Sequence, residues 1–143
     1  MADQGAKGTE ERTASSRPRR TSLLLGDTLM FLIFAVVGRT FHTMQNSAMG
    51  VLGVAFPFLA GWLLAGAITH AYGARATSSP ARAARNALVT WVLAVPLGLA
   101  IRALILGRPS QSAFVTVVVI YTLVALVGWR VLYSLIASRT GAQ

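Results

Sequence analysis

Two charged residues of opposite sign lie within long apolar stretches of this sequence, and their types are the ones best suited to chemistry. Asp27 lies near the start of an apolar run and is the only acidic residue after Glu11. Arg130 lies near the end of the last apolar run. An ionised carboxylate deep in a bilayer costs roughly 2.5–3.5 kcal/mol on insertion scales, so Asp27 must face protein, face water or hold a proton.

The pair supports two hypotheses. In an up-down arrangement of helices, Asp27 near the start of the first helix and Arg130 near the end of the fourth reach similar depth on the same side. One hypothesis is an intramembrane ion pair that fixes how the first helix packs on the fourth. The other is a protonatable site in a carrier, because a single carboxylate is enough for proton coupling. The sequence leaves both open.

A second group of cations is expected near the opposite face of the membrane. It consists of Arg39, His42, Arg102 and Arg108, with no acidic residue on that side. One hypothesis is an anion site for a lipid phosphate, a carboxylate or a quinone carbonyl. The alternative is that Arg39 and Arg108 extend to lipid headgroups and that Arg102 caps helix carbonyls.

Other kinds of site find little support. The chain has no cysteine, which excludes disulfides, iron–sulfur clusters and thiolate zinc sites. His42 and His70 end different helices nearly a bilayer apart, so they cannot share one metal or haem. We find no Ser-His-Asp set, phosphate loop or metal-ligand cluster. We therefore expect no enzyme, no cofactor and no metal.

The composition indicates the elements that position these residues. Hydrophobic residues make up 55% of the 143 positions and charged residues 12%, about half the roughly 25% of a soluble domain. Four apolar runs each reach the ~20 residues that span a bilayer, and helices satisfy their backbone within lipid. The predicted fold is all-α, an integral membrane up-down bundle. Its transmembrane domain covers 22–137, with helices at approximately 22–41, 48–71, 87–106 and 112–136.

The flanking segments and helix interiors carry further signals. Residues 1–21 are polar and basic and predict a disordered tail, and 138–143 form a short second tail. Pro57 and Pro96 fall inside helices and predict kinks. Ala94 and Gly98 precede Arg102 at a spacing of four, so this small-residue face is expected to pack closely and direct Arg102 into the bundle or an interface.

The arginine and lysine distribution predicts the orientation. Nine of the 13 basic residues fall on the side of the two termini and the second link, and three fall on the other side. Both termini are therefore expected in the cytoplasm, with the bundle in the cell membrane. The net charge of +9 then reflects topology and anionic headgroups rather than nucleic-acid binding. Trp91, Trp129, Tyr72 and Tyr133 are expected at the cytoplasmic interface as an aromatic belt.

Several motifs in order resemble a known family. They are "GDTLMFLIFAVVGRTFH", "FPFLAGW", the spacing from Trp91 through Pro96 and Gly98 to Arg102, and "LVGWR". This combination, over roughly Leu25 to Tyr133, is similar to an uncharacterised prokaryotic membrane family, domain of unknown function 3054. The resemblance implies a four-helix membrane protein and no established activity. It covers Asp27, Gly38, Arg39, His42, Pro57, Gly61, Trp62, Trp91, Arg102, Gly128, Trp129 and Arg130. Where the family has a small hydroxyl residue before the histidine, this chain has Phe41.

Three functional hypotheses follow. The first is a structural or accessory membrane protein, as a monomer or within a larger membrane complex. The second is a small proton-coupled transporter of an anionic substrate, with Asp27 as the proton site and the Arg39–Arg102 group as the anion site. Because four helices enclose little volume, this second hypothesis needs a homodimer or higher oligomer. The third is a protein that binds a membrane lipid or quinone through the same outer cations.

Overall fold

The computed structural model describes residues 3–41 and 47–140, with side chains described over 19–40 and 47–140. These residues contain four helices and no strand. The helices are α1 (Asp3–Phe41), α2 (Ala48–Ile68), α3 (Pro80–Leu106) and α4 (Ser112–Arg139). The all-α prediction is confirmed.

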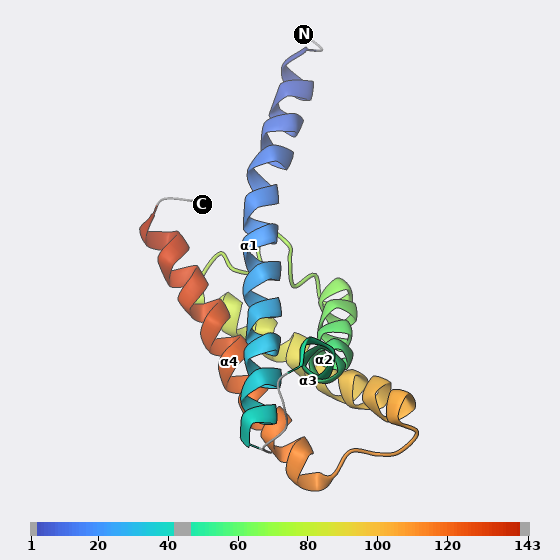
Figure 1. Ribbon diagram of the computed structural model, residues 1–143. Coiled ribbons are helices and arrows are strands. Elements are labelled where there is room, and N and C mark those ends of the chain that lie inside the picture. The colour runs from blue at the N-terminus through green and yellow to red at the C-terminus, as the bar shows by residue number, and fades with distance from the viewer. Residues whose placement is uncertain (1–2, 42–46, 141–143) are drawn as a thin grey trace.

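The four helices close into a ring. Each helix packs against its neighbours in sequence, and α4 also packs against α1. The chain enters α1 and leaves α4 at the same end of the bundle, while the link from α3 to α4 lies at the other end (Figure 1). The ring therefore brings the part of α1 around Asp27 beside the later part of α4, although Asp27 and Arg130 are 103 positions apart in sequence.

The distribution of apolar side chains is that of a membrane protein. All four helices are long and apolar enough to span a bilayer. Large apolar side chains point outward from every helix, whereas Asp27 and Arg130 are buried. The most exposed examples, one on each helix, are Leu25 (66%), Met49 (81%), Leu104 (84%) and Val124 (68%). Such a surface requires an apolar solvent, so the chain is a multi-pass membrane protein.

The first helix is longer than the sequence indicated. A disordered tail was predicted over 1–21, whereas α1 begins at Asp3. The segment includes alanine, glutamine, glutamate, lysine and arginine, which tolerate helix well. Because nucleation is the costly step of helix formation, a helix already formed by the apolar run extends outward at little cost.

The link between α2 and α3 is shorter than predicted, because α3 begins much earlier than predicted while α2 ends only slightly earlier. α2 ends at Ile68 rather than near residue 71, since His70 adopts a left-handed backbone (φ 53°) and the Ala71 N–H returns to the Gly66 carbonyl at 2.8 Å. α3 begins at Pro80 rather than near residue 87. Ser79 caps it by accepting from the Arg82 N–H.

Proline ends neither of the helices that contain it. α2 continues through the buried Pro57 and α3 through the exposed Pro96. In Figure 1 the first part of α2 is seen end-on and the later part from the side, so α2 changes direction along its length. The kinks at Pro57 and Pro96 stay predictions.

Small residues bring α2 and α3 into backbone contact. A Cβ on Gly61 would lie 2.7 Å from the Gly98 nitrogen and 2.8 Å from the Ala94 carbonyl oxygen. The face of Ala94 and Gly98 thus packs closely, as predicted. Beside this contact, rings from three helices fill the centre of the bundle. They are Phe31, Phe34, Phe58, Trp62, Phe114 and Tyr121.

Candidate functional site

Asp27 and Arg130 meet between α1 and α4. Nη2 of Arg130 lies 2.6 Å from Oδ2 of Asp27, and Nε lies 3.3 Å from Oδ1. Neither side chain has any exposed surface. The guanidinium therefore binds both carboxylate oxygens, the geometry in which an arginine–carboxylate pair is strongest.

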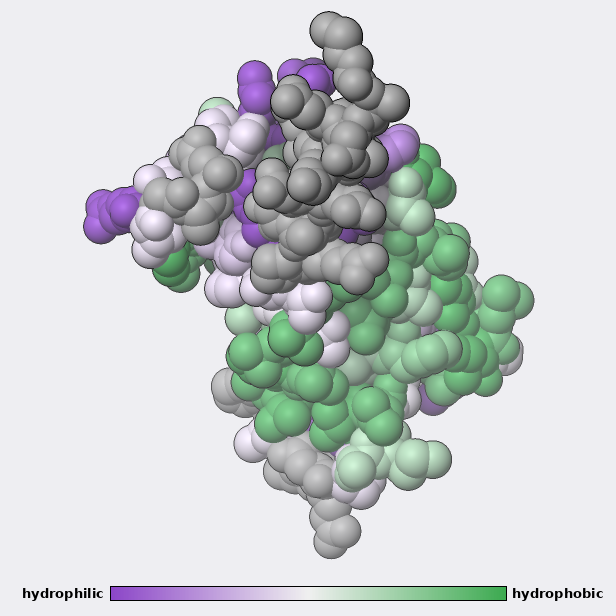
Figure 2. All heavy atoms as spheres, turned by 90° about the horizontal axis from the view of Figure 1, so that it is seen from above, coloured by the Kyte–Doolittle hydropathy of each residue, from purple (hydrophilic) through white to green (hydrophobic). Residues whose placement is uncertain are grey.

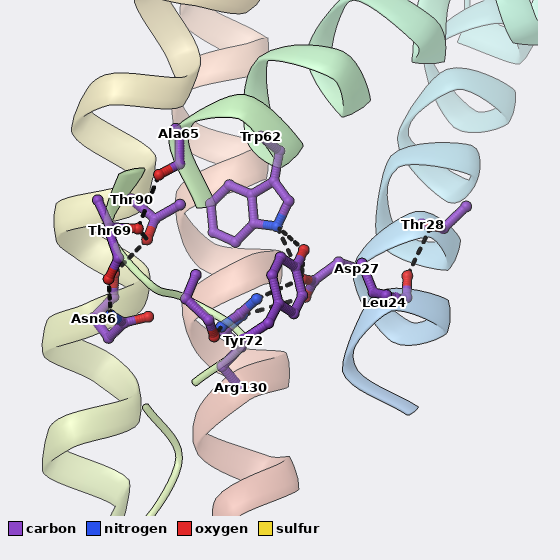
Figure 3. Close-up of polar contacts among 11 residues, drawn as sticks. Leu24, Asp27, Thr28, Trp62, Ala65, Thr69, Tyr72, Asn86, Thr90 and Arg130 are labelled. Atoms are coloured by element: carbon purple, nitrogen blue, oxygen red, sulfur yellow. Dashed lines mark hydrogen bonds and ion pairs between the residues drawn. The ribbon is translucent and has the colours of Figure 1, made fainter. Parts of the chain in front are cut away.

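Two aromatic side chains complete the surroundings of the carboxylate. Nε1 of Trp62, on α2, donates to Oδ2 of Asp27 at 2.8 Å, and the Tyr72 hydroxyl donates to the same oxygen at 2.7 Å. Figure 3 shows both polar atoms directed at the carboxylate beside the arginine. With the two bonds from Arg130, Asp27 accepts four hydrogen bonds and its charge is well compensated.

Arg130 also holds the segment that joins α2 to α3. Its Nη1 donates to the Ala71 carbonyl at 2.6 Å. Its Cζ lies 5.3 Å from the Trp62 ring centroid and 4.9 Å from that of Tyr72, so the cation also contacts two aromatic faces. One turn further along α4, the Ser134 hydroxyl donates to the Thr77 carbonyl at 3.0 Å. The 69–79 segment is thus bound to α4 at two points.

The 69–79 segment is bound to α3 as well. The Thr69 and Thr90 hydroxyls lie 2.7 Å apart, and Nδ2 of Asn86 donates to the Thr69 carbonyl at 3.2 Å (Figure 3). Because these contacts lie beside those of Arg130, α1 around Asp27, the ends of α2 and α4 and the first half of α3 form one hydrogen-bonded region. The Asp27–Arg130 pair is its only salt bridge among the residues whose side chains are described.

Tyr72 is the member of this group whose protonation is most clearly constrained. Burial raises the pKa of its phenol above the ordinary value of 10.0, and the neighbouring charge of Asp27 raises it further. Tyr72 therefore stays neutral and keeps its proton as a donor to Asp27.

A glycine next to Asp27 permits a further close contact between α1 and α4. A Cβ on Gly26 would overlap the indole of Trp129 on α4. Gly26 directly precedes Asp27, so this approach sets the distance at which the carboxylate reaches Arg130.

Two of the predicted outer cations, Arg39 and Arg102, contact different helices. The Arg39 guanidinium lies against Gly50 of α2. Arg102 lies over the Phe114 ring with Cζ 4.3 Å from its centroid, and Arg108 is exposed just beyond α3. His42 falls outside the described residues. The structure thus places Arg39 between α1 and α2 and Arg102 between α3 and α4, and a shared anion site stays a prediction.

Sequence reasoning missed two hydrogen-bond donors to the Asp27 carboxylate, Tyr72 and Trp62. Tyr72 was assigned to an interfacial belt together with Trp91, which instead donates to Thr122 of α4 at 2.9 Å. Trp62 appeared only as a motif position. A signal was available: a buried indole or phenol needs an acceptor, and Asp27 is the only side-chain carboxylate in the apolar part of the chain.

The arrangement can hold a charge pair in place, and within the described residues no group of three His, Cys, Asp or Glu could bind a metal. Fold and site together define a four-helix integral membrane protein with a buried ion pair. A family model described as "Protein of unknown function (DUF3054)" matches residues 24–133, and the chain belongs to this family. No curated protein and no solved structure matches the chain.

Proposed function

We propose that the protein is a structural or accessory integral membrane protein without enzymatic activity. In it the Asp27–Arg130 pair holds α1, α4 and the 69–79 segment together. The observation that carries this proposal is the state of the Asp27 carboxylate, which has no exposed surface and accepts four hydrogen bonds. A carboxylate that carries protons must exchange them with water, whereas both oxygens of this one are bonded to protein donors and neither is exposed.

The centre of the bundle supports the same proposal. A cavity of about 10 Å³ lies among aromatic and apolar side chains beside Trp62, which is room for about one water molecule. A transported anion would need a much wider path. A carrier built from this chain would therefore have to form its path between protomers.

The distribution of basic residues supports a location and an orientation. We assign the bundle to the plasma membrane with both termini in the cytoplasm, because nine basic residues lie on that side and three on the other. Its partners are membrane lipids and, for an accessory role, a second copy or a larger membrane complex. Nucleic acid is not among them.

Proton flux tests the proposal against the carrier alternative. The full-length chain is reconstituted in vesicles that contain a pH-sensitive dye, and a pH gradient and candidate organic anions are applied. We expect the same proton flux as in protein-free vesicles. A proton flux through the unchanged chain would overturn the structural assignment if Asp27→Asn abolished it while the variant kept the helical circular dichroism of the folded protein.

A further inference from the structure

Two open grooves meet at Arg85, on the surface of α3. The first has a volume of about 590 Å³ and lies between the 69–79 segment and the first turns of α3. Its charged lining consists of Arg75, Arg82 and Arg85. The second has a volume of about 450 Å³ and lies between α3 and α4. Apart from Arg85, its lining is apolar or glycine: Ala84, Leu88, Leu123, Val124, Val127 and Gly128.

The first groove is suited to an anion. All three arginines are exposed, and Nη1 of Arg82 donates to the Ser78 hydroxyl at 3.1 Å, which holds that side chain near the groove. The only acidic residue after Glu11 is Asp27, and it is engaged by Arg130. The groove arginines thus face no competing carboxylate from the membrane domain. Guanidinium groups bind phosphate oxygens through paired N–H donors.

The second groove is suited to a hydrocarbon chain. Leu88 and Val124 on its two sides are 46% and 68% exposed, so it opens toward the lipid. A Cβ at Gly128 would meet nothing within 4 Å, which leaves a depression along α4. Seen from the end that carries the termini, hydrophilic side chains gather on one part of the surface and apolar side chains cover the neighbouring part (Figure 2).

We propose that the two grooves bind one anionic phospholipid, with its phosphate among Arg75, Arg82 and Arg85 and an acyl chain between α3 and α4. Arg85 lines both grooves, so the charged groove lies next to the apolar groove, as the headgroup of a phospholipid lies next to its acyl chains. A free phosphate ion would use only the first groove. No residue of this site belongs to the Asp27–Arg130 pair or to the outer cations, and its charge pattern does not require an accessory role. Arg130 does hold the 69–79 segment, which forms one wall of the first groove.

Binding is measured by native mass spectrometry of the full-length protein in mild detergent, titrated with phosphatidylglycerol or with phosphatidylcholine. We expect tighter binding of phosphatidylglycerol. A charge near a membrane surface is worth about 1 kcal/mol, or about fivefold in affinity, so the triple change Arg75→Gln, Arg82→Gln and Arg85→Gln should weaken binding about a hundredfold. The matched control removes three cations at the same end but outside the grooves, with Arg19→Gln, Arg20→Gln and Arg139→Gln. It should weaken binding less than tenfold.

The apolar half is tested without changing charge. Gly128→Leu fills the depression between α3 and α4 and should weaken phosphatidylglycerol binding at least tenfold. Gly53→Leu is the control, because Gly53 is also exposed, has open space around its missing Cβ and lies on α2. Equal losses in the two triple variants would overturn the proposal. So would competition by millimolar inorganic phosphate together with unchanged binding in Gly128→Leu, because that result assigns the site to a free ion.

Discussion

Separating Asp27 from Arg130 tests the structural role of the pair most directly. Arg130→Gln removes the guanidinium bonds to Asp27 at 2.6 and 3.3 Å and the bond to the Ala71 carbonyl at 2.6 Å. Asp27→Asn removes the negative charge and turns one acceptor oxygen into a donor, which then faces the donors already present. Loss of one partner from a buried pair costs about 3–5 kcal/mol, because the other charge is left uncompensated.

The double variant is expected to lose about as much as one single variant, not the sum. The amide side chains that replace Asp27 and Arg130 in it are both neutral, so neither leaves a buried charge. The coupling free energy, obtained from the two single variants and the double, should therefore be about 3 kcal/mol. The assay is the free energy of unfolding in mixed micelles of mild detergent and dodecyl sulfate, followed by loss of helical circular dichroism.

A control pair shows whether the coupling is specific. Arg102 contacts Phe114 and makes no bond to Asp27. Asp27→Asn combined with Arg102→Gln should therefore be additive within about 0.5 kcal/mol. Additive losses for Asp27→Asn with Arg130→Gln would refute the reasoning, since they would mean that the two side chains stabilise the fold independently.

Three further predictions use the same unfolding assay. Trp62→Phe removes an N–H bonded to a charged oxygen and should lower the free energy of unfolding by about 1.5–3 kcal/mol. Trp91→Phe removes an N–H bonded to a neutral hydroxyl and should lower it by about 0.5–1.5 kcal/mol. Equal losses in the two variants would contradict a charged acceptor at Trp62. Gly61→Ala forces α2 away from α3 and should cost about 1–3 kcal/mol, whereas Gly53→Ala meets open space and should stabilise by up to about 1 kcal/mol. The raised pKa of Tyr72 means that, as the pH rises, the unfolded chain loses the phenol proton before the folded chain does. The contribution of Tyr72 to the free energy of unfolding is therefore complete below pH 10.0 and falls above it. Tyr72→Phe should flatten the fall of the unfolding free energy above that pH, and an unchanged slope would contradict the role of the buried phenol.

The end of α2 illustrates what periodicity and hydropathy miss. The apolar run continues to Ala71, but the backbone turns at His70, whose left-handed conformation is uncommon for any residue other than glycine. No glycine marks this end. By contrast, the start of α3 is encoded locally by Ser79 and Pro80, a capping signal that a search for apolar runs alone passes over.

The sequence by itself determined that four helices span a membrane, because lipid leaves no other solution for a run of about 20 apolar residues. The sequence also required that Asp27 face protein, face water or hold a proton. It also indicated Arg130, since an up-down order fixes which helix ends share a depth. Only the tertiary structure decided that Trp62 and Tyr72 complete the carboxylate, that the 69–79 segment binds α4 through backbone carbonyls, and that two grooves meet at Arg85. These depend on helix rotation and on the path of a short link, which are set by packing among all four helices together.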